Sequence, residues 1–432
     1  MSKKFLTLIS VMLIAVFVLV ACGPAATPTA AVEPTSAPEA TKAPAATEAP
    51  TVAPTEPTVK GNVVIWHSKK TEETNSLNAI IAGFKVLYPD VNVQALFVPD
   101  NDLRNKFETA VGSGSGPTIL IGAADWGPAS FNAQLVQDLT PMLTAGLLDT
   151  LNDAAVASVK YKDAVIGLPI NLKGVVMYRN SSIVAEPAKD LADLLVKAKA
   201  ANKGDVVGLD FETGFFFAAG HLAAMGGKLM DPNTGEPTFN DATGAAWLAA
   251  IKSVKTAGFP VENNNDNDVN LFKAGKAGVI IDGTWNAKAL SDAIGADKLV
   301  IDPWPAGMSG YVQNDNIYLT TTAAGDDAIA SEKFMEYFVS KEAQAMWADV
   351  GTTIPMAGGI PVIKGMEVSD PVEKMEVAAF AGGTAFPVIP QMGAYWDPMN
   401  NAILSVLDKG TDPAAALQTA FDAVKEAVAK IQ

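Results

Sequence analysis

The chain has 432 residues and a formal net charge of -16 at pH 7. A negative balance of this size disfavours nucleic acid and anionic lipid surfaces as partners. Arg104 and Arg179 are the only arginines, and since phosphate or carboxylate ligands are usually gripped by bidentate guanidinium groups, an uncharged ligand is favoured. A single cysteine excludes an internal disulfide, and two histidines cannot assemble a histidine zinc site, so we expect no metal and no cofactor.

The N-terminus has the features of a secretory signal. The basic start MSKK is followed by a mostly apolar run over residues 5–21 that ends in LVAC at residues 19–22. The LVAC motif resembles the lipobox of bacterial lipoproteins, which implies a signal peptide over residues 1–21 and lipidation of Cys22. An uncleaved membrane anchor is the alternative, although the run falls short of the ~20 residues needed to span a bilayer. Either reading places the bulk of the chain outside the cytoplasm, at the cell surface or in the periplasm.

Residues 22–59 predict a tether. They consist largely of Pro, Ala, Thr and Glu, with eight prolines and almost no large apolar residue, so they cannot bury a core. At ~3.1 Å per residue such a semi-extended segment reaches on the order of 100 Å.

From residue 60 the pattern predicts an open α/β sheet. About 370 residues remain, enough for two or three domains at ~150 residues each. The expected elements alternate as strand 63–66, helix 77–87, strand 91–98, a helix that Asp100 can cap, and strand 118–121. In such sheets ligands bind beyond the carboxyl ends of the strands, so residues 67–73 and 123–127 form the candidate rim.

Charged and acidic side chains at this rim are candidate ligand groups. Lys70, Glu72 and Glu73 suit sugar hydroxyls because charged groups form the stronger hydrogen bonds, while a solvated charged turn explains them equally well. Asp125 follows a strand, where a helix cap is as good an explanation as a ligand contact.

Two polar loops are rejected as binding motifs. GSGSG at residues 112–116 precedes a strand rather than a helix and lacks a following Lys-Ser/Thr, so it is no phosphate loop. NNNDNDVN at residues 263–270 lacks the glycine and glutamate of a calcium loop. We expect it to be a polar surface loop that caps a helix beginning near Val269.

The middle of the chain carries further aromatic residues. Strands are expected at residues 164–169 and 175–178, and a helix at 189–201. The consecutive phenylalanines of residues 215–217 cannot share one helix face, so at least two of them belong to a core. Trp247 and Trp347 lie in amphipathic helices and are also expected in the core. For His221 we expect a structural role.

Strand 278–282 places one tryptophan at the rim. The strand ends just before Trp285, at the opening of the next helix, which is the same strand-end placement as Asp125.

The stretch 386–403, FPVIPQMGAYWDPMNNAI, is a proline-containing segment that leads into a helix. Pro387 and Pro390 remove two backbone donors and fix two φ angles, which predicts an ordered extended crossing. Tyr395 and Trp396 follow. The Trp396 indole suits the C–H face of a pyranose ring or the core beneath the following helix, and the residues alone leave both open.

Two motifs resemble the maltose and maltodextrin-binding proteins of ABC transporters, in extracellular solute-binding protein family 1. These are PVIPQMGAYW followed by PMNNAI, and LFKAGKAGVIIDGTWNAKA at residues 271–289. The resemblance implies an α/β, two-lobed periplasmic-binding-protein-like fold of type II with three hinge crossings, the third at residues 368–376. Lobe 1 would comprise 60–171 with 318–370, and lobe 2 would comprise 172–317 with 371–432.

The resemblance also implies a sugar site, to which Asp125 would contribute a carboxylate that accepts hydrogen bonds from sugar hydroxyls. The candidate ligand residues are Asp125, Trp126, Trp285, Trp396, Phe216, Tyr395, Lys70, Glu72 and Lys173. The chain departs from the family pattern at several of these places. Lys173 and Gly214 stand where sugar-contacting glutamates are expected, Trp126 replaces an arginine and Gly122 replaces a tryptophan, so the ligand could be another α-glucan, a cyclodextrin or a different neutral oligosaccharide.

The function implied is that of a lipid-anchored, monomeric substrate-binding component that delivers a maltodextrin-like oligosaccharide to a membrane permease and its ATPase, and is not an enzyme. An extracellular glycoside hydrolase is the alternative, but it requires two carboxylates about 5–9.5 Å apart, and only Asp125 is strongly placed. A binder of anionic ligands is disfavoured by the arginine count.

Overall fold

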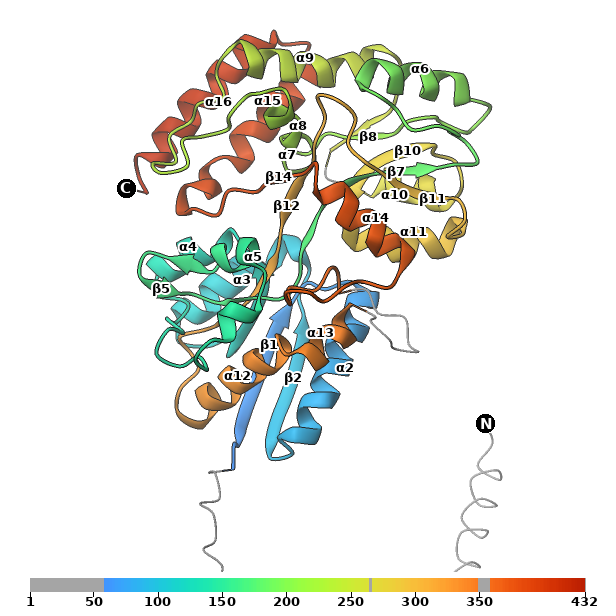
Figure 1. Ribbon diagram of the computed structural model, residues 1–432. Coiled ribbons are helices and arrows are strands. Elements are labelled where there is room, and N and C mark those ends of the chain that lie inside the picture. Colours follow the sequence, from blue (N-terminus) through green and yellow to red (C-terminus); the bar gives the residue numbers. More distant parts are fainter. Residues whose placement is uncertain (1–57, 264–265, 349–357, 432) are drawn as a thin grey trace, which may run out of the picture. The chain divides into compact units, whose positions relative to one another are not determined.

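The computed structural model describes residues 58–263, 266–348 and 358–431, which belong to one compact unit, Pro57–Gln432. This unit has two lobes, each built on its own β-sheet with helices on both faces (Figure 1). The predicted signal peptide, Cys22 and the predicted tether lie outside the described residues, except for the last residues of the tether.

The first lobe is organised around a five-stranded sheet of order β2-β1-β3-β13-β6. β1 runs parallel to β2 and β3, whereas β13 is antiparallel to β3 and β6. The strand bounds are β1 (Gly61–His67), β2 (Val91–Phe97), β3 (Ile119–Ala123), β6 (Leu168–Pro169) and β13 (Asp315–Leu319). The strands expected from the alternation of apolar residues are therefore present, but residues 164–169 form two short strands instead of one.

Alternation along these strands sends side chains to two separate cores, as the pleat requires. Ile119 and Ile121 of β3 join the cluster containing Phe84 and Phe334, while Leu120 joins the cluster containing Phe107 on the opposite face. The first face is covered by α2 (Thr71–Leu87), α12 (Gly325–Phe338) and α13 (Lys341–Trp347), and the second by α3 (Asp100–Gly112) and α4 (Trp126–Asn132) (Figure 1). Smaller elements complete the lobe: η1 (Leu147–Thr150), α5 (Asp153–Ala157), β4 (Lys160–Tyr161) and β5 (Ala164–Val165).

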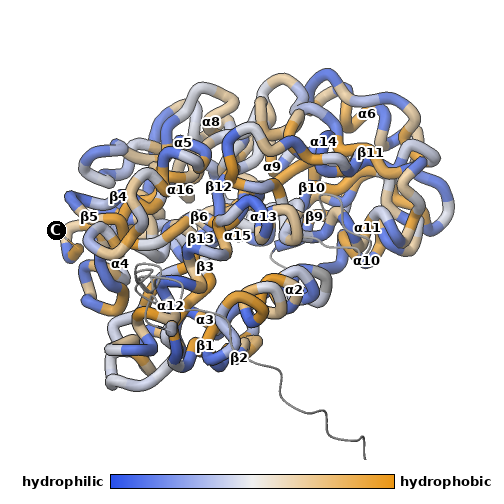
Figure 2. The backbone as a smooth tube through the Cα atoms, turned by 60° about the horizontal axis from the view of Figure 1, so that its bottom comes forward, coloured by the Kyte–Doolittle hydropathy of each residue, from blue (hydrophilic) through white to orange (hydrophobic). Residues whose placement is uncertain are grey.

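The second lobe has a sheet of order β10-β7-β12-β14, with β11 also paired to β7. The bounds are β7 (Lys173–Asn180), β10 (Val279–Gly283), β11 (Leu299–Asp302), β12 (Tyr311–Gln313) and β14 (Thr384–Ala385). The strands β3, β10 and β11 have the hydrophobic colour expected of buried strands (Figure 2). Along β7, Val175 and Met177 face one core whereas Val176 and Tyr178 face another.

Helices cover both faces of this sheet as well. The larger core includes side chains of α6 (Leu191–Ala201), α7 (Phe215–Ala218), α8 (Gly220–Ala224), α9 (Ala242–Thr256), α15 (Trp396–Asp408) and α16 (Pro413–Val428). The smaller core includes side chains of α10 (Asn267–Lys273), α11 (Ala287–Ile294) and α14 (Pro371–Phe380). The remaining elements are β8 (Phe211–Glu212), β9 (Val261–Glu262), η2 (Thr284–Asn286) and η3 (Pro390–Ala394). Trp247 and Trp347 are fully buried, as predicted.

The chain passes between the lobes three times. Two passages are short, from β6 into β7 and from β12 into β13, and the third leads from residues 360–363 into α14. The prediction that residues 368–376 form the third crossing was wrong in extent, because α14 already begins at Pro371. Asp100 is likewise the first residue of α3 rather than its cap, since Pro99 occupies that position.

One buried side chain joins the three crossing segments. Asn171 Nδ2 donates to the carbonyl of Gly358 at 2.8 Å, and Asn171 Oδ1 accepts from the backbone N–H of Asp315 at 2.8 Å. Because a buried amide that loses a partner leaves a polar group unsatisfied, these hydrogen bonds hold the three crossing segments together.

Candidate ligand site between the lobes

A cavity of about 470 Å³ lies between the two lobes. Its size is within the range of roughly 300–1,000 Å³ that is typical of small-molecule sites. Residues that follow β1 and β3 line one side, and residues from α7, η2 and the start of α15 line the other. The rim predicted from the strand ends is therefore where the cavity lies.

Seven of the nine candidate ligand residues line this cavity: Lys70, Asp125, Trp126, Lys173, Phe216, Trp285 and Trp396. Tyr395 does not. It is fully buried and its hydroxyl donates to the carbonyl of Gly235 at 2.7 Å, so its prediction as a ligand residue is not supported by its position. Glu72 lies in α2, and its side chain is outside the described part of the chain.

The second lobe contributes an aromatic wall. Phe216 is 7% exposed and stacks on Trp396 with ring centroids 6.2 Å apart and an interplanar angle of 16°. It also contacts the Trp285 ring at 6.2 Å. Both indoles are half-buried, with Phe216 packed behind them, so each is held by its backing contact while part of its surface faces the cavity. Phe215 and Phe216 both belong to the buried core cluster of the second lobe, which confirms that at least two of the three consecutive phenylalanines are core residues.

Trp285 owes its position to a glycine at the end of β10. A Cβ atom at Gly283 would lie 2.1 Å from the Trp285 ring, so only glycine lets the indole fold back over the strand end. The residue lies in η2, directly after the strand, as its sequence position predicted.

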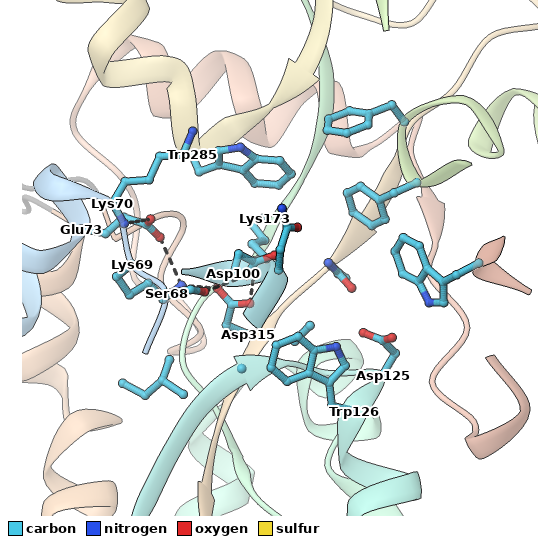
Figure 3. Close-up of a pocket in the computed structure, with 18 residues that line it drawn as sticks. Ser68, Lys69, Lys70, Glu73, Asp100, Asp125, Trp126, Lys173, Trp285 and Asp315 are labelled. Carbon is cyan, nitrogen blue, oxygen red and sulfur yellow. Dashed lines mark hydrogen bonds and ion pairs between the residues drawn. The ribbon is translucent and has the colours of Figure 1, made fainter. Parts of the chain in front are cut away.

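The first lobe provides a third tryptophan opposite this wall. Trp126 opens α4, and a Cβ atom at Gly122 would lie 2.6 Å from its ring. The tryptophan that the family pattern expects at position 122 is thus absent, but the indole of Trp126 lies over that glycine. The departures at positions 122 and 126 are therefore coupled, and this side of the cavity keeps an aromatic surface (Figure 3).

Asp125 is a buried carboxyl with an unused acceptor. It is 4% exposed, it makes no capping hydrogen bond to α4, and its Oδ2 has no hydrogen-bond partner among the described residues. Burial raises the pKa of its carboxyl to about 6. The helix-cap explanation therefore fails. Gln313 also lines the cavity, and its shielded Oε1 is a second acceptor that no described residue contacts by a hydrogen bond.

A cluster of ion pairs forms the floor of the cavity (Figure 3). Lys69 contacts both Asp315 and Glu73, the latter at 3.1 Å, and Lys173 lies 2.5 Å from Asp315. Burial alone would raise the pKa of Asp315, but the two ammonium groups outweigh it and lower the pKa to about 2. The same carboxylates raise the pKa of buried Lys69 above its usual value, against the effect of burial.

The three cavity lysines are all engaged. Besides its contact with Asp315, the Lys173 ammonium lies 5.4 Å from the Trp285 ring centroid, within cation–π range. Lys70 donates to Asn286 Oδ1 at 3.0 Å, and this hydrogen bond joins the first lobe to the second. The lysine at position 173 therefore adds no uncompensated positive charge.

Sequence reasoning missed several cavity residues. Lys69, Asp100, Gln313 and Asp315 line the cavity but were not predicted as ligand residues. Lys69 stands beside Lys70 just after an apolar strand, and this position could have identified it as a residue of the rim. Asp100 Oδ1 accepts a hydrogen bond from Ser68 at 2.7 Å. Asp315 offered no local signal, because its partner Lys69 lies 246 positions away.

The described residues contain no group of three or more His, Cys, Asp or Glu side chains arranged to hold a metal ion. A search of the same residues finds no helix long and apolar enough to cross a membrane. Of the cavity carboxylates, Glu73 and Asp315 are both paired with Lys69.

Two lobes, three crossings and a ligand-sized cavity between them define a two-lobed binding protein of type II. Residues 79–380 match the family model described as bacterial extracellular solute-binding protein. The chain belongs to this family.

Two curated relatives cover most of the chain. A maltotriose-binding protein of Pyrococcus abyssi is 25% identical over 369 residues, spanning 80% of this chain and 78% of the relative. A galactooligosaccharide-binding protein of Bacillus subtilis is 24% identical over 385 residues, spanning 84% and 88%. Among solved structures, the GacH receptor of Streptomyces glaucescens, determined without ligand and with acarbose, matches with a TM-score of 0.77 at 21% identity, covering 86% of this chain and 99% of the receptor.

Proposed function

We propose that this chain is the substrate-binding component of a carbohydrate ABC importer, and that it binds a neutral, maltodextrin-like oligosaccharide between its lobes. The observation that carries the proposal is the cavity itself, whose lining combines half-buried indoles with two polar side chains, Asp125 and Gln313, that each keep an acceptor without a partner among the described residues. Sugar rings combine an apolar C–H face with hydroxyl donors, so stacking on Trp285 and Trp396 and hydrogen bonds to Asp125 Oδ2 and Gln313 Oε1 complement them.

The charges of the cavity support an uncharged ligand. An anionic ligand would need cations that are free to meet it, whereas Lys69 and Lys173 are already paired with carboxylates and Lys70 donates to the neutral amide of Asn286. Drawing Lys69 or Lys173 away from its partners would leave buried carboxylates unpaired, which costs about 3–5 kcal/mol. The names of the relatives, one for maltotriose and one for galactooligosaccharides, also favour a neutral sugar while leaving its identity open.

The two-lobed arrangement provides the mechanism of capture. A sugar that touches the aromatic wall of one lobe and Asp125 and Trp126 of the other stabilises the conformation in which the lobes lie together. The Lys70–Asn286 hydrogen bond adds to the same conformation. The closed form would then dock on the membrane permease, with Cys22 carrying the lipid that keeps the chain at the membrane as a monomer.

The test is titration of the purified chain with maltose, maltotriose, a cyclodextrin and sucrose, followed by tryptophan fluorescence and calorimetry. We expect saturable binding of the α-glucans that is lost in Trp396→Ala and Trp285→Ala. Trp304→Phe is the matched control, because Trp304 packs against the core of the second lobe and does not line the cavity. Equal binding by all three variants would show that the sugar does not use this cavity.

Enzymatic activity has a separate test. Glu73 and Asp315 are held in ion pairs and Asp100 accepts a hydrogen bond from Ser68, so each cavity carboxyl that could act with Asp125 in glycoside hydrolysis is already engaged. We therefore expect no release of reducing ends during prolonged incubation with maltodextrin, and release that disappears in Asp125→Asn would show a hydrolase instead.

Lipid anchoring is tested by partition of the expressed full chain into detergent. We expect the parent to enter the detergent phase and Cys22→Ser to remain in the aqueous phase. Equal partition of the parent and Cys22→Ser would contradict the prediction of a lipid anchor at Cys22.

A further inference from the structure

A chain of three side chains joins the two lobes and ends at a buried carboxyl. Lys70, which precedes α2 in the first lobe, donates to Asn286 Oδ1 at 3.0 Å, and Asn286 Nδ2 donates to Asp282 Oδ1 at 3.0 Å. Asn286 and Asp282 belong to the second lobe, and both are buried. Separation of the lobes therefore breaks the first hydrogen bond and leaves the second intact. We call Lys70, Asn286 and Asp282 the inter-lobe chain.

The protonation state of Asp282 controls which way the Asn286 amide points. An ionised carboxylate only accepts hydrogen bonds and an ammonium group only donates them, so the amide nitrogen must face Asp282 and the amide oxygen must face Lys70. A protonated Asp282 can donate its own O–H to the amide oxygen. The amide nitrogen would then face Lys70, donor against donor. The inter-lobe chain is therefore fixed in its connecting orientation only when Asp282 is ionised.

Several ionisable groups act on Asp282 and determine when it holds a proton. Within the second lobe these are Glu212 of β8, Asp268 of α10 and Tyr178 of β7, whereas Lys70 acts from the first lobe. Asp268 is fully buried, and neither of its carboxyl oxygens has a hydrogen-bond partner among the described residues. Because like charges in a buried site disfavour each other's ionisation, this part of the second lobe retains protons at a pH where exposed carboxyls have lost theirs.

The balance of these effects allows Asp282 to titrate near neutral pH. Burial raises the pKa of Asp282 to about 7, although the Gly283 N–H, the Lys70 ammonium and the Asn286 amide each lower it. When the lobes separate, Lys70 moves away, so its lowering effect is lost and the pKa of Asp282 rises further. The closed form therefore ionises at a lower pH than the open form.

We infer that Asp282 is a positioning residue for lobe closure, because in its ionised state it turns Asn286 toward Lys70, and that closure over a sugar releases a proton from Asp282 to the solvent. The inference rests on the proposed function for its sugar, but the coupling between proton and closure is a property of the sugar-free chain as well.

Closure becomes more favourable as the pH rises above about 7. In that range the closed form gives up its proton while the open form keeps it, so a lower proton concentration shifts the equilibrium toward closure. The gain becomes constant once the open form is ionised as well. Asp125 adds little in this range, because a pKa of about 6 leaves its carboxyl already mostly ionised above pH 7.

The experiment measures maltotriose binding to the full chain by calorimetry at pH 7 and pH 8.5, in two buffers whose heats of ionisation differ. For the parent we expect about threefold tighter binding at pH 8.5 and a fraction of a proton released for each sugar bound. In Asp282→Asn and Lys70→Met we expect both effects to disappear, because the amide has no proton to lose and the methionine has no charge to lower the pKa of Asp282.

Lys288→Met is the matched control. Lys288 is a lysine of the second lobe that pairs with Asp292 on its own helix and does not line the cavity, so its removal should leave the pH dependence of the parent unchanged. The same four proteins without sugar are compared by X-ray scattering. We expect the radius of gyration to decrease from pH 7 to pH 8.5 in the parent and in Lys288→Met only.

Two results would overturn the inference. One is a parent whose radius of gyration and maltotriose affinity do not change between pH 7 and pH 8.5, and the other is a pH dependence that persists in Asp282→Asn. If the parent does not bind maltotriose while its radius of gyration still depends on pH and on Asp282, the α-glucan proposal fails and the coupling of proton and closure stands.

Discussion

Replacement of Asp125 by asparagine should make the sugar-free protein more stable and its sugar binding weaker. Asp125 is 4% exposed, and its Oδ2 has no partner among the described residues. Burial raises the pKa of its carboxyl from the ordinary 3.8 to about 6. Each pKa unit corresponds to about 1.4 kcal/mol, so keeping this group charged at neutral pH costs the folded state about 3 kcal/mol.

The pH dependence follows from proton binding in the two states. Below pH 3.8 the Asp125 carboxyl is protonated in both the folded and the unfolded chain, so it contributes nothing. Between about pH 4 and pH 6 the unfolded chain is ionised while the folded chain keeps its proton, so the free energy of unfolding falls as the pH rises. Above pH 6 the loss is complete and constant. Asp125→Asn removes this loss, because the amide resembles the protonated acid in shape.

The assay is urea unfolding of the parent and of Asp125→Asn at pH 4, 5, 6 and 7.5, without sugar. We expect the variant to be more stable by about 3 kcal/mol at pH 7.5 and the difference to vanish near pH 4. Affinity for maltotriose should drop by roughly tenfold or more, because a hydrogen bond to a charged acceptor contributes about 1.5–3 kcal/mol. A less stable variant at pH 7.5, or a stability difference that does not change with pH, would refute the account of Asp125 as a buried, unpartnered carboxylate.

Three further substitutions test the rest of the site. Lys69→Met should lower the free energy of unfolding by about 3–5 kcal/mol in urea titration, because it leaves buried carboxylates without their shared cation; a loss under about 1 kcal/mol would contradict the cluster. Lys70→Met should increase the radius of gyration of the sugar-free protein in X-ray scattering, because it removes the hydrogen bond to Asn286 across the lobes, and an unchanged radius would show that this bond does not hold them. Tyr395→Phe should cost about 1 kcal/mol of stability through its lost hydroxyl bond but leave the maltotriose affinity unchanged, whereas a tenfold loss of affinity would place Tyr395 in the site after all.

The parts of the site that the sequence could predict are those set by local rules. Trp285 and Asp125 each follow a buried strand, and the carboxyl ends of strands meet at one edge of a sheet, so both side chains were expected at the rim and both line the cavity. The first three strands of the first lobe and the two helices between them were also predicted from the spacing of apolar residues, whereas residues 164–169 form two short strands instead of the one expected.

The parts that the sequence could not predict depend on contacts between distant segments. Tyr395 adjoins Trp396 in the chain, but its hydroxyl bonds to a carbonyl 160 positions away, which turns the ring into the core. Asp315 becomes the centre of the cavity floor only because β13 lies beside β3 and near the end of β1. Asn171 joins three crossings by hydrogen bonds to Gly358 and Asp315, and its local sequence contains nothing that distinguishes it from any polar residue in a loop.

The two lobes contribute different interactions to the cavity, an aromatic stacking surface from the second lobe and a hydrogen-bond acceptor from the first. The second-lobe indoles of Trp285 and Trp396 are backed by the buried ring of Phe216, so the surface on which a sugar would stack is preformed. Among the cavity carboxylates of the first lobe, Glu73 and Asp315 are paired with lysines, whereas Asp125 Oδ2 has no hydrogen-bond partner among the described residues. A sugar on the aromatic wall therefore gains its strongest hydrogen bond only when the first lobe approaches, which couples lobe closure to the presence of a ligand that has both an apolar face and a hydroxyl donor.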